Sequence, residues 1–125
     1  MKRNTIIFFT IGGLLLLALL GYGVYSGFQP SKYDAFATCV KDSGAKFYGA
    51  FWCPHCQDQK TMFKQSAKLL PYIECSTPDG QGQTQICKDA NVTGYPTWEF
   101  ADGTRVNGVA QFATLSEKTS CVLPS

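Results

Sequence analysis

The chain begins with a long stretch that carries no charge and is mostly apolar. No charged residue occurs from Asn4 to Ser31, and of the twenty positions from Ile6 to Tyr25 fifteen are apolar, four are glycine and one is threonine. About twenty helical residues suffice to cross the hydrocarbon core of a bilayer. The pattern therefore predicts a transmembrane helix through residues 6–25. Residues 1–28 would be a cytoplasmic stub and anchor, and residues 29–125 a separate domain.

Charges around this stretch predict its orientation. Lys2 and Arg3 precede it, and Lys32 is the nearest cation after it, so the positive-inside bias places the N-terminus in the cytoplasm. The anchor is then expected in the plasma (inner) membrane and the following domain in the periplasm or an equivalent extracytoplasmic space. A cleaved signal peptide is the alternative. Its apolar region is usually about 7–15 residues and ends at a small-residue cleavage site, whereas this run is longer and shows no clear site.

Residues 29–125 alternate between helical and strand-like patterns. Helices are predicted over residues 33–43, 53–70, 84–91 and 115–120, and strands over residues 45–51, 72–75, 97–101 and 104–107. The helix between the first two strands implies that they pair in parallel, and Asp102-Gly103 predicts a hairpin between the last two. We therefore expect an α/β domain with a mixed central sheet flanked by helices, preceded by a single N-terminal transmembrane helix.

The charge distribution argues against nucleic-acid binding. The chain has 11 Lys+Arg and 9 Asp+Glu, for a net charge of +2. All nine acids and nine of the cations lie beyond residue 28, so the excess belongs to Lys2 and Arg3. A nucleic-acid surface needs clustered cations opposite the phosphates, and we expect none here.

All six cysteines also lie beyond residue 28. An even number in an extracytoplasmic domain of fewer than about 100 residues predicts disulfides, because that compartment is oxidising and a small core gains from cross-links. A zinc site is the alternative, but it needs a second close pair of Cys or His ligands. The only histidine, His55, lies inside the Cys53–Cys56 pair. We therefore expect no metal, and no cofactor.

The segment Phe-Trp-Cys-Pro-His-Cys lies where a predicted strand gives way to a helix. At a helix start, unpaired N–H groups and the positive end of the dipole favour a thiolate at Cys53, which is the attacking species in disulfide exchange. Pro54 suits the first turn because its missing N–H would have no partner there. Cys56 can close a disulfide with Cys53 or resolve a mixed one, and His55 can stabilise the thiolate. A purely structural bridge is the alternative, but so short a loop gains little chain entropy.

The Trp-Cys-Pro-His-Cys stretch, together with Tyr95-Pro96-Thr97 about forty residues later, resembles the thioredoxin superfamily. The Pro-His dipeptide between the cysteines is also similar to that of DsbA, a strong oxidant. A more specific resemblance is to the thioredoxin-like domain associated with bacterial homologues of vitamin K epoxide reductase. It covers nearly all of residues 33–121. This resemblance rests on three motifs. The first is residues 48–57, and the third is Gly-Tyr-Pro-Thr-Trp at 94–98. The second consists of Glu-Cys at 74–75, the Asp-Gly-Gln turn at 79–81 and the cysteine at 87.

The resemblance implies a thioredoxin-like fold and a role for individual residues. Cys53 would be the nucleophile and Cys56 the resolving thiol. Pro96 would follow a cis peptide bond and form the wall on the substrate side, facing the two cysteines. Trp52 and Tyr95 flank the reactive groups in this fold, so we expect them to contact substrate.

Two further aromatic residues, Tyr48 and Trp98, lie in predicted strands. Aromatic side chains in strands more often belong to the core than to a binding surface. We therefore expect both to be buried.

The other four cysteines allow three pairings. Cys75 ends a strand and Cys87 lies on the helix after the intervening loop, so a local bridge is sterically reasonable, and the resemblance implies it. Cys39 then pairs with Cys121, which would tie the first helix of the domain to the last. A thioredoxin-type topology could instead place those two helices on opposite faces.

Two features depart from the resemblance. Thioredoxin and DsbA carry an acidic residue six positions before the first active-site cysteine, where it assists proton transfer to the buried thiol. Here that position is Phe47, so Glu74 or water would have to substitute. The chain also has one predicted span and no quinone-binding helical bundle, so we expect any membrane reductase partner to be a separate polypeptide.

The sequence thus predicts a membrane-anchored, extracytoplasmic thiol–disulfide oxidoreductase. It would donate the Cys53–Cys56 disulfide to client proteins with Cys thiols, and a separate quinone-linked, vitamin K epoxide reductase-like or DsbB-like membrane protein would reoxidise it. A reductase or isomerase recharged by a membrane thiol carrier is the first alternative, because direction depends on reduction potential. A non-catalytic, disulfide-stapled binding module is the second.

Overall fold

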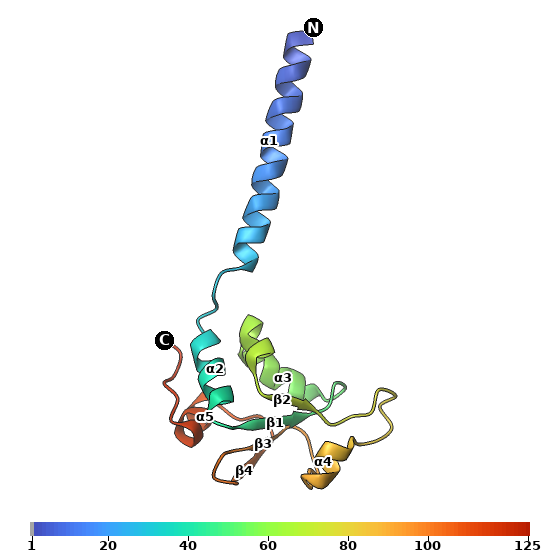
Figure 1. The fold of residues 1–125 in the computed structure, drawn as a ribbon, viewed down its shortest axis with the longest axis vertical. Helices are drawn as coiled ribbons and strands as arrows, with labels where there is room; N and C mark the ends of the chain where they lie inside the picture. Colours follow the sequence, from blue (N-terminus) through green and yellow to red (C-terminus); the bar gives the residue numbers. More distant parts are fainter. Residues whose placement is uncertain (1) are drawn as a thin grey trace. The chain divides into compact units, whose positions relative to one another are not determined.

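The computed structural model describes residues 2–125, which divide into a first unit ending at Pro30 and a second unit over Ser31–Ser125. The first unit is dominated by one helix, α1 (Lys2–Gly27) (Figure 1). It is long and apolar enough to cross a membrane, and its described side chains are exposed. A signal sequence near an N-terminus would meet the same criteria of length and composition.

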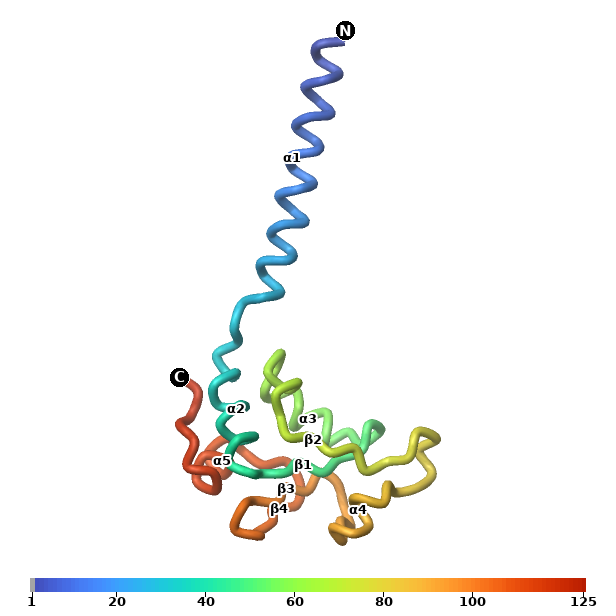
Figure 2. The backbone as a smooth tube through the Cα atoms, viewed as in Figure 1, coloured from blue at the N-terminus to red at the C-terminus, as the bar shows by residue number. Residues whose placement is uncertain are grey.

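The second unit is a four-stranded mixed sheet with helices on both faces, and Figure 2 traces the chain through it. Its elements are α2 (Asp34–Asp42), β1 (Lys46–Gly49), α3 (Pro54–Met62), the 3-10 helix η1 (Lys64–Leu69), β2 (Tyr72–Glu74), α4 (Gln85–Asp89), β3 (Thr97–Glu99), β4 (Arg105–Asn107) and α5 (Phe112–Thr119). The strand order is β2-β1-β3-β4. Strand β1 runs parallel to β2, and β3 is antiparallel to β1 and β4. The predicted α/β class, the parallel first pair and the final hairpin are confirmed.

Two predicted helices differ from the observed ones. The pattern predicts one helix over residues 53–70, but α3 ends at Met62 and the chain continues as η1 after a left-handed turn at Lys64, whose φ is 51°. This turn breaks the helical repeat and accompanies the complete burial of Phe63. The last helix begins at Phe112, earlier than the predicted residue 115, because the Phe112 ring packs edge-on against Phe63 at 4.9 Å between centroids.

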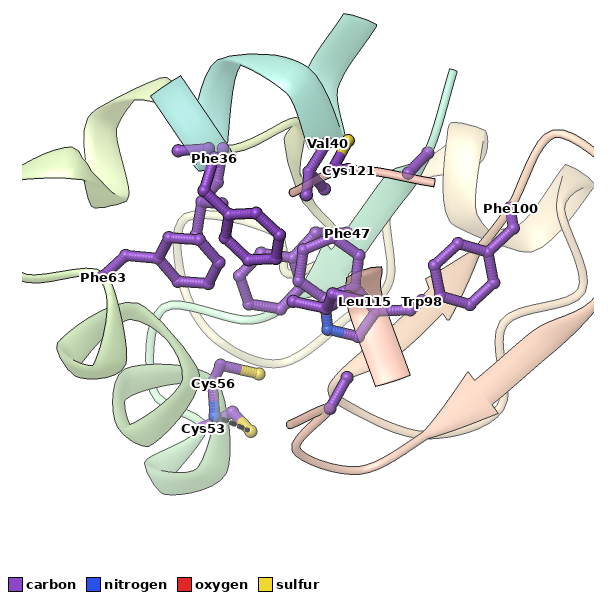
Figure 3. Packing of buried hydrophobic residues seen from close by; sticks show 14 of the residues in the cluster. Phe36, Val40, Phe47, Cys53, Cys56, Phe63, Trp98, Phe100, Leu115 and Cys121 are labelled. Atoms are coloured by element: carbon purple, nitrogen blue, oxygen red, sulfur yellow. Dashed lines mark hydrogen bonds between the residues drawn. The ribbon is translucent and has the colours of Figure 1, made fainter. Parts of the chain in front are cut away.

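The sheet separates two apolar clusters because successive side chains of a strand point to opposite faces. Phe47 of β1 stacks on Trp98 of β3, with ring centroids 4.7 Å apart, in the larger cluster that α2, α3 and α5 complete (Figure 3). Tyr48 packs on the other face against the buried Cys75 and Cys87. Both Tyr48 and Trp98 are buried, as the strand pattern predicts.

A buried amide joins α3 to the rest of the domain. Gln59 is fully buried, and its Oε1 accepts hydrogen bonds from Trp98 Nε1 at 3.0 Å and from the backbone N of Ala110 at 2.7 Å. Its Nε2 donates to the carbonyl oxygen of Ala110 at 3.1 Å. The helix that carries the cysteine motif is thereby fixed to β3 and to the loop before α5.

We expect Gln59→Leu to lower the free energy of unfolding by at least about 3 kcal/mol. The substitution approximately preserves volume but leaves the Trp98 N–H and both backbone groups of Ala110 buried without this partner, and each such loss costs about 1–3 kcal/mol. Urea unfolding followed by circular dichroism measures the change. Gln81→Leu, at an exposed position, is the control and should change stability by no more than about 0.5 kcal/mol. Equal effects of the two substitutions would contradict the role of Gln59.

Candidate active site

Strand β1 delivers the chain to the first cysteine. After the strand ends at Gly49, a short turn closes with a hydrogen bond from the backbone N of Cys53 to the carbonyl oxygen of Ala50, at 3.0 Å. Cys53 is the N-cap of α3 with extended backbone angles, and Pro54 follows in the first turn. The Cys53 sulfur therefore lies at the positive end of the helix dipole, where a negative charge is stabilised.

The sulfur of Cys53 also serves as the helix cap. The backbone N of Cys56 donates to Cys53 Sγ at 3.3 Å (Figure 3). A serine or aspartate oxygen usually accepts this kind of hydrogen bond at an N-cap. A thiolate at Cys53 would receive the same bond as a charge-assisted one, which is stronger.

The two thiols are free in this structure and differ in accessibility. Cys53 retains 5% of its surface and Cys56 retains none. Burial raises the pKa of Cys56 to about 12, and the hydrogen bond with Cys53 contributes to the rise. Cys56 is thus a protonated thiol at neutral pH, and Cys53 is the less buried of the two free cysteines.

Pro96 lies beside this segment because β3 pairs with β1. Tyr48 is opposite Thr97 in the sheet, so the residue before Thr97 adjoins the chain that leaves the end of β1. The Tyr95–Pro96 peptide bond is cis, and Pro96 is fully buried. The pairing brings the proline and the turn that leads to the two cysteines to the same end of β1 and β3.

Trp52 and Tyr95 form a partly exposed aromatic pair. Trp52 precedes Cys53 in the chain and is 53% exposed. Its ring meets that of Tyr95 edge-on, with centroids 6.0 Å apart, and its Nε1 donates to Ser76 Oγ at 2.9 Å. The Tyr95 hydroxyl accepts from Gln83 Nε2 at 2.9 Å. The two rings are therefore held in place by the segment after β2 while part of their surface stays open.

His55 lies on the solvent side of α3. Its Nδ1 is 3.4 Å from Asp58 Oδ2, and the two side chains are 73% and 68% exposed. When the ring is protonated this is a surface ion pair, which contributes little to stability. The structure thus places His55 beside Asp58, and its expected stabilisation of a Cys53 thiolate stays a prediction.

Phe47 brings no charge to the buried thiol, but Tyr72 of β2 lies near it and is hydrogen-bonded to a carboxylate. A Cβ on Gly49 would lie 2.7 Å from Cε2 and 3.4 Å from the hydroxyl oxygen of Tyr72, and 3.1 Å from Cys56 Sγ. The missing side chain at Gly49 therefore lets the Tyr72 ring and the Cys56 sulfur share one small space. The Tyr72 hydroxyl donates to Glu74 Oε2 at 2.8 Å.

The thioredoxin family model matches residues 29–120. This range contains the whole sheet, both free cysteines and the cis-proline. The chain belongs to the thioredoxin family. Such a match over most of the chain confirms the thioredoxin-superfamily resemblance of the sequence motifs.

Two curated relatives share this thioredoxin domain. Thiol-disulfide oxidoreductase LTO1 of Arabidopsis thaliana is 46% identical over 90 residues, which cover 68% of this chain and 23% of that protein. The thioredoxin domain-containing protein 5 homolog of Drosophila melanogaster is 31% identical over 91 residues, 63% of this chain and 21% of that protein. The chain thus spans less than a quarter of the length of either relative. The domain is thus similar to part of a protein named as a thiol–disulfide oxidoreductase and to part of one named for its thioredoxin domain.

Two disulfides brace this thioredoxin domain. Cys75 is bonded to Cys87, with an S–S distance of 1.97 Å, and Cys39 to Cys121, at 2.07 Å. The first bridge ties α4 to the end of β2. The second joins α2 to the residue that follows the C-cap of α5, so the two helices do not lie on opposite faces of the sheet.

Sequence reasoning missed two residues of the thioredoxin domain that support the site. Gln59 shows no chemical signal in the sequence, because a glutamine inside a helical pattern is ordinarily exposed. Tyr72 is a strand aromatic, and its proximity to Cys56 depends on the missing side chain at Gly49. The glycine at the end of a predicted strand, immediately before the cysteine motif, is the signal that could have indicated a close approach.

Proposed function

We propose that this chain is a membrane-anchored, extracytoplasmic thiol–disulfide oxidoreductase that oxidises client proteins. One observation carries the proposal: Cys53, the N-cap of α3, keeps a small exposed surface of 5%, whereas Cys56, one turn later, is fully buried. An attacking thiol must be reachable, whereas a resolving thiol has to reach only its neighbour. The arrangement suits an exchange in which Cys53 bonds to the client and Cys56 does not.

The reaction begins with the Cys53–Cys56 disulfide. A client thiolate attacks Cys53 Sγ, the bond to Cys56 breaks, and Cys56 leaves with the electron pair and then takes a proton. A second client thiolate attacks the client sulfur of the mixed disulfide and releases Cys53 as a thiolate. The client has lost two electrons and gained a disulfide. A quinone-linked membrane oxidoreductase, of the vitamin K epoxide reductase-like or DsbB-like kind, then removes the two electrons from Cys53 and Cys56.

The surroundings of Cys53 support binding of an extended client segment. The half-exposed Trp52 with Tyr95 supplies an apolar contact next to Cys53, and Pro96, fully buried in this structure, would back the same site as its wall. Aromatic residues of this kind combine a large apolar surface with a polar group that can hydrogen-bond. His55 assists by stabilising the thiolate.

The length and apolar composition of α1 support the membrane anchor, and the two disulfides support an extracytoplasmic location. Residues 6–25 cross the membrane with the N-terminus in the cytoplasm, because the cations precede the span. The domain is then in an oxidising space, where the Cys39–Cys121 and Cys75–Cys87 bridges persist. This places the exchange reaction among proteins that are themselves acquiring disulfides.

The full-length Cys56→Ala variant should accumulate mixed disulfides with client proteins through Cys53, because the resolving thiol is absent. Non-reducing electrophoresis of cells that express it, followed by mass spectrometry of the captured proteins, measures the accumulation. The double variant Cys53→Ala/Cys56→Ala is the matched control and should capture nothing. A Cys56→Ala variant that captures no client would indicate a binding module and overturn the proposal.

The direction of exchange is read from the reduction potential. A protein oxidase should lie well above about −270 mV, the value of thioredoxin, and toward the about −120 mV of DsbA. Equilibration of the full chain with glutathione buffers gives the potential of the Cys53–Cys56 pair. A value near that of thioredoxin would contradict the oxidase direction and favour a reductase or isomerase.

A further inference from the structure

Cys56 has to exchange a proton inside the protein. It is fully buried, and burial is the main reason that its pKa rises to about 12. When the disulfide with Cys53 opens, Cys56 leaves as a thiolate and must be protonated. When Cys56 resolves a mixed disulfide, it must first lose that proton. A positioned acid–base group beside a buried thiol would speed both steps.

The residue six positions before Cys53 cannot act in this way, because Phe47 is apolar and its ring stacks on Trp98. The neighbouring strand β2 carries the polar groups that β1 lacks at this position, a tyrosine hydroxyl and a carboxylate. A Cβ on Gly49 would lie 3.4 Å from the Tyr72 hydroxyl oxygen and 3.1 Å from Cys56 Sγ. The two groups therefore border the same space above Gly49. The Tyr72 hydroxyl in turn donates to Glu74 Oε2 at 2.8 Å.

We propose that Tyr72 and Glu74 carry the proton of Cys56, with the Glu74 carboxylate as the base and the Tyr72 hydroxyl as the relay between them. The physiological use of this relay rests on the thiol–disulfide exchange proposed above. Neither residue needs to touch the client.

Glu74 is held in the orientation that the relay requires. Its Oε1 accepts hydrogen bonds from the backbone N of Phe51 at 3.2 Å and of Ser76 at 2.9 Å. These two bonds leave Oε2 for the Tyr72 hydroxyl. The carboxylate therefore has a hydrogen-bond partner on each oxygen, and Oε2 is the oxygen that is bonded to the Tyr72 hydroxyl.

The other charges around Cys56 fit the same scheme. Cys53 at the N-cap of α3 and Lys60 within α3 act on it, and Tyr72 of β2 interacts with both Cys56 and Glu74. Lys60 Nζ lies 3.5 Å from the centroid of the Tyr72 ring, and its charge opposes the rise in the pKa of Cys56. Burial and the hydrogen bond to Glu74 raise the pKa of Tyr72. Tyr72 thus keeps its own proton at neutral pH and acts as a relay, not as a base.

The proposed step balances without any further reactant. In resolution, the Cys56 thiol gives its proton to the Tyr72 oxygen while the Tyr72 proton moves to Glu74 Oε2. The Cys56 thiolate then attacks Cys53 Sγ, and the bond from Cys53 to the client breaks, releasing the client as a thiolate. When a client opens the Cys53–Cys56 disulfide, the proton travels the opposite way.

The reduced full-length chain in detergent, mixed with 5,5′-dithiobis(2-nitrobenzoate), separates the two thiols. Attack by Cys53 releases one coloured thionitrobenzoate, and attack by Cys56 on the resulting mixed disulfide releases a second. We expect Tyr72→Phe and Glu74→Gln each to slow the second release at pH 7 by at least about tenfold, since general acid–base groups contribute about 10²–10⁴-fold. The first release should stay within about twofold of wild type.

The variants are chosen to leave the packing in place. Tyr72→Phe removes only the hydroxyl, so the ring keeps its edge-on contact with Phe47 at 5.1 Å between centroids. Glu74→Gln keeps an oxygen for the two backbone donors. Glu117→Gln, which changes an exposed carboxylate of α5, is the control and should alter neither release.

The pH profile distinguishes a relay from a merely structural role. Without the base, hydroxide must remove the proton, so the second release of the variants should rise about tenfold per pH unit below the pKa of Cys56. It should approach the flatter wild-type profile at high pH, whereas a structural defect would lower the rate at every pH. A wild-type rate and profile of the second release in either variant would overturn the proposal. Because the probe is a small disulfide, this result does not depend on whether client proteins are captured by Cys56→Ala.

Discussion

Replacing Cys53 with serine should abolish thiol–disulfide exchange, lowering its rate by at least about 1000-fold. A serine hydroxyl forms no disulfide, so activity could survive only if Cys56 took over the attack. Cys56 has no exposed surface. With a pKa of about 12, only about one molecule in 10⁵ carries its thiolate at pH 7. Burial and protonation therefore both prevent Cys56 from replacing Cys53.

Stopped-flow measurement with the same aromatic disulfide tests this expectation. Cys53→Ser should give neither coloured release on the timescale of the wild type, while Cys56→Ser should retain the first release and lose the second. Circular dichroism of both variants checks the fold. Rapid release from Cys53→Ser would show that Cys56 is open to solvent, and the assignment of the two thiols would have to be reversed.

The order of elements could be predicted because it depends on local patterns. The alternation of apolar segments, the turn at Asp102-Gly103 and the helix-starting position of Cys53 each appear within a few residues of sequence. The break of the helix at Lys64 could not be predicted in this way. It depends on Phe63 packing against Phe112, from an element nearly fifty residues away.

The site shows the same division. The Cys53–Cys56 spacing indicates exchange chemistry directly, and the missing acid at Phe47 is visible in the sequence. The groups that we propose in place of that acid come together only in the folded chain, because Gly49 of β1 makes room for Tyr72 of β2 beside the Cys56 sulfur of α3. The sequence pointed to Glu74 as a candidate but offered no reason to consider Tyr72. Local motifs thus identify the reactive atoms, and packing identifies the groups that supply their protons.

Removing the Cys39–Cys121 disulfide should lower the free energy of unfolding more than removing the other structural disulfide, Cys75–Cys87. The bridge closes a sequence separation of 82 residues, and the chain-entropy estimate for a loop of that length is about 4.5 kcal/mol at 25 °C. The Cys75–Cys87 bridge closes a separation of only 12, for which the same estimate gives about 3 kcal/mol. Since domains of this size are stable by about 5–15 kcal/mol, the longer bridge accounts for a large share of the total.

The matched variants are Cys39→Ala/Cys121→Ala and Cys75→Ala/Cys87→Ala, since alanine leaves neither an unpaired thiol nor a buried hydroxyl. Guanidinium unfolding of each, compared with wild type under non-reducing conditions, should show the larger fall in unfolding free energy for the first pair. Neither pair belongs to the reactive site, so attack by Cys53 on the aromatic disulfide should stay within about twofold of wild type while the protein is folded. If the Cys75–Cys87 pair instead proved more costly to remove, loop entropy would not set the order. The packing of Cys75 and Cys87 against Tyr48, in the cluster below the sheet, would then be the dominant contribution.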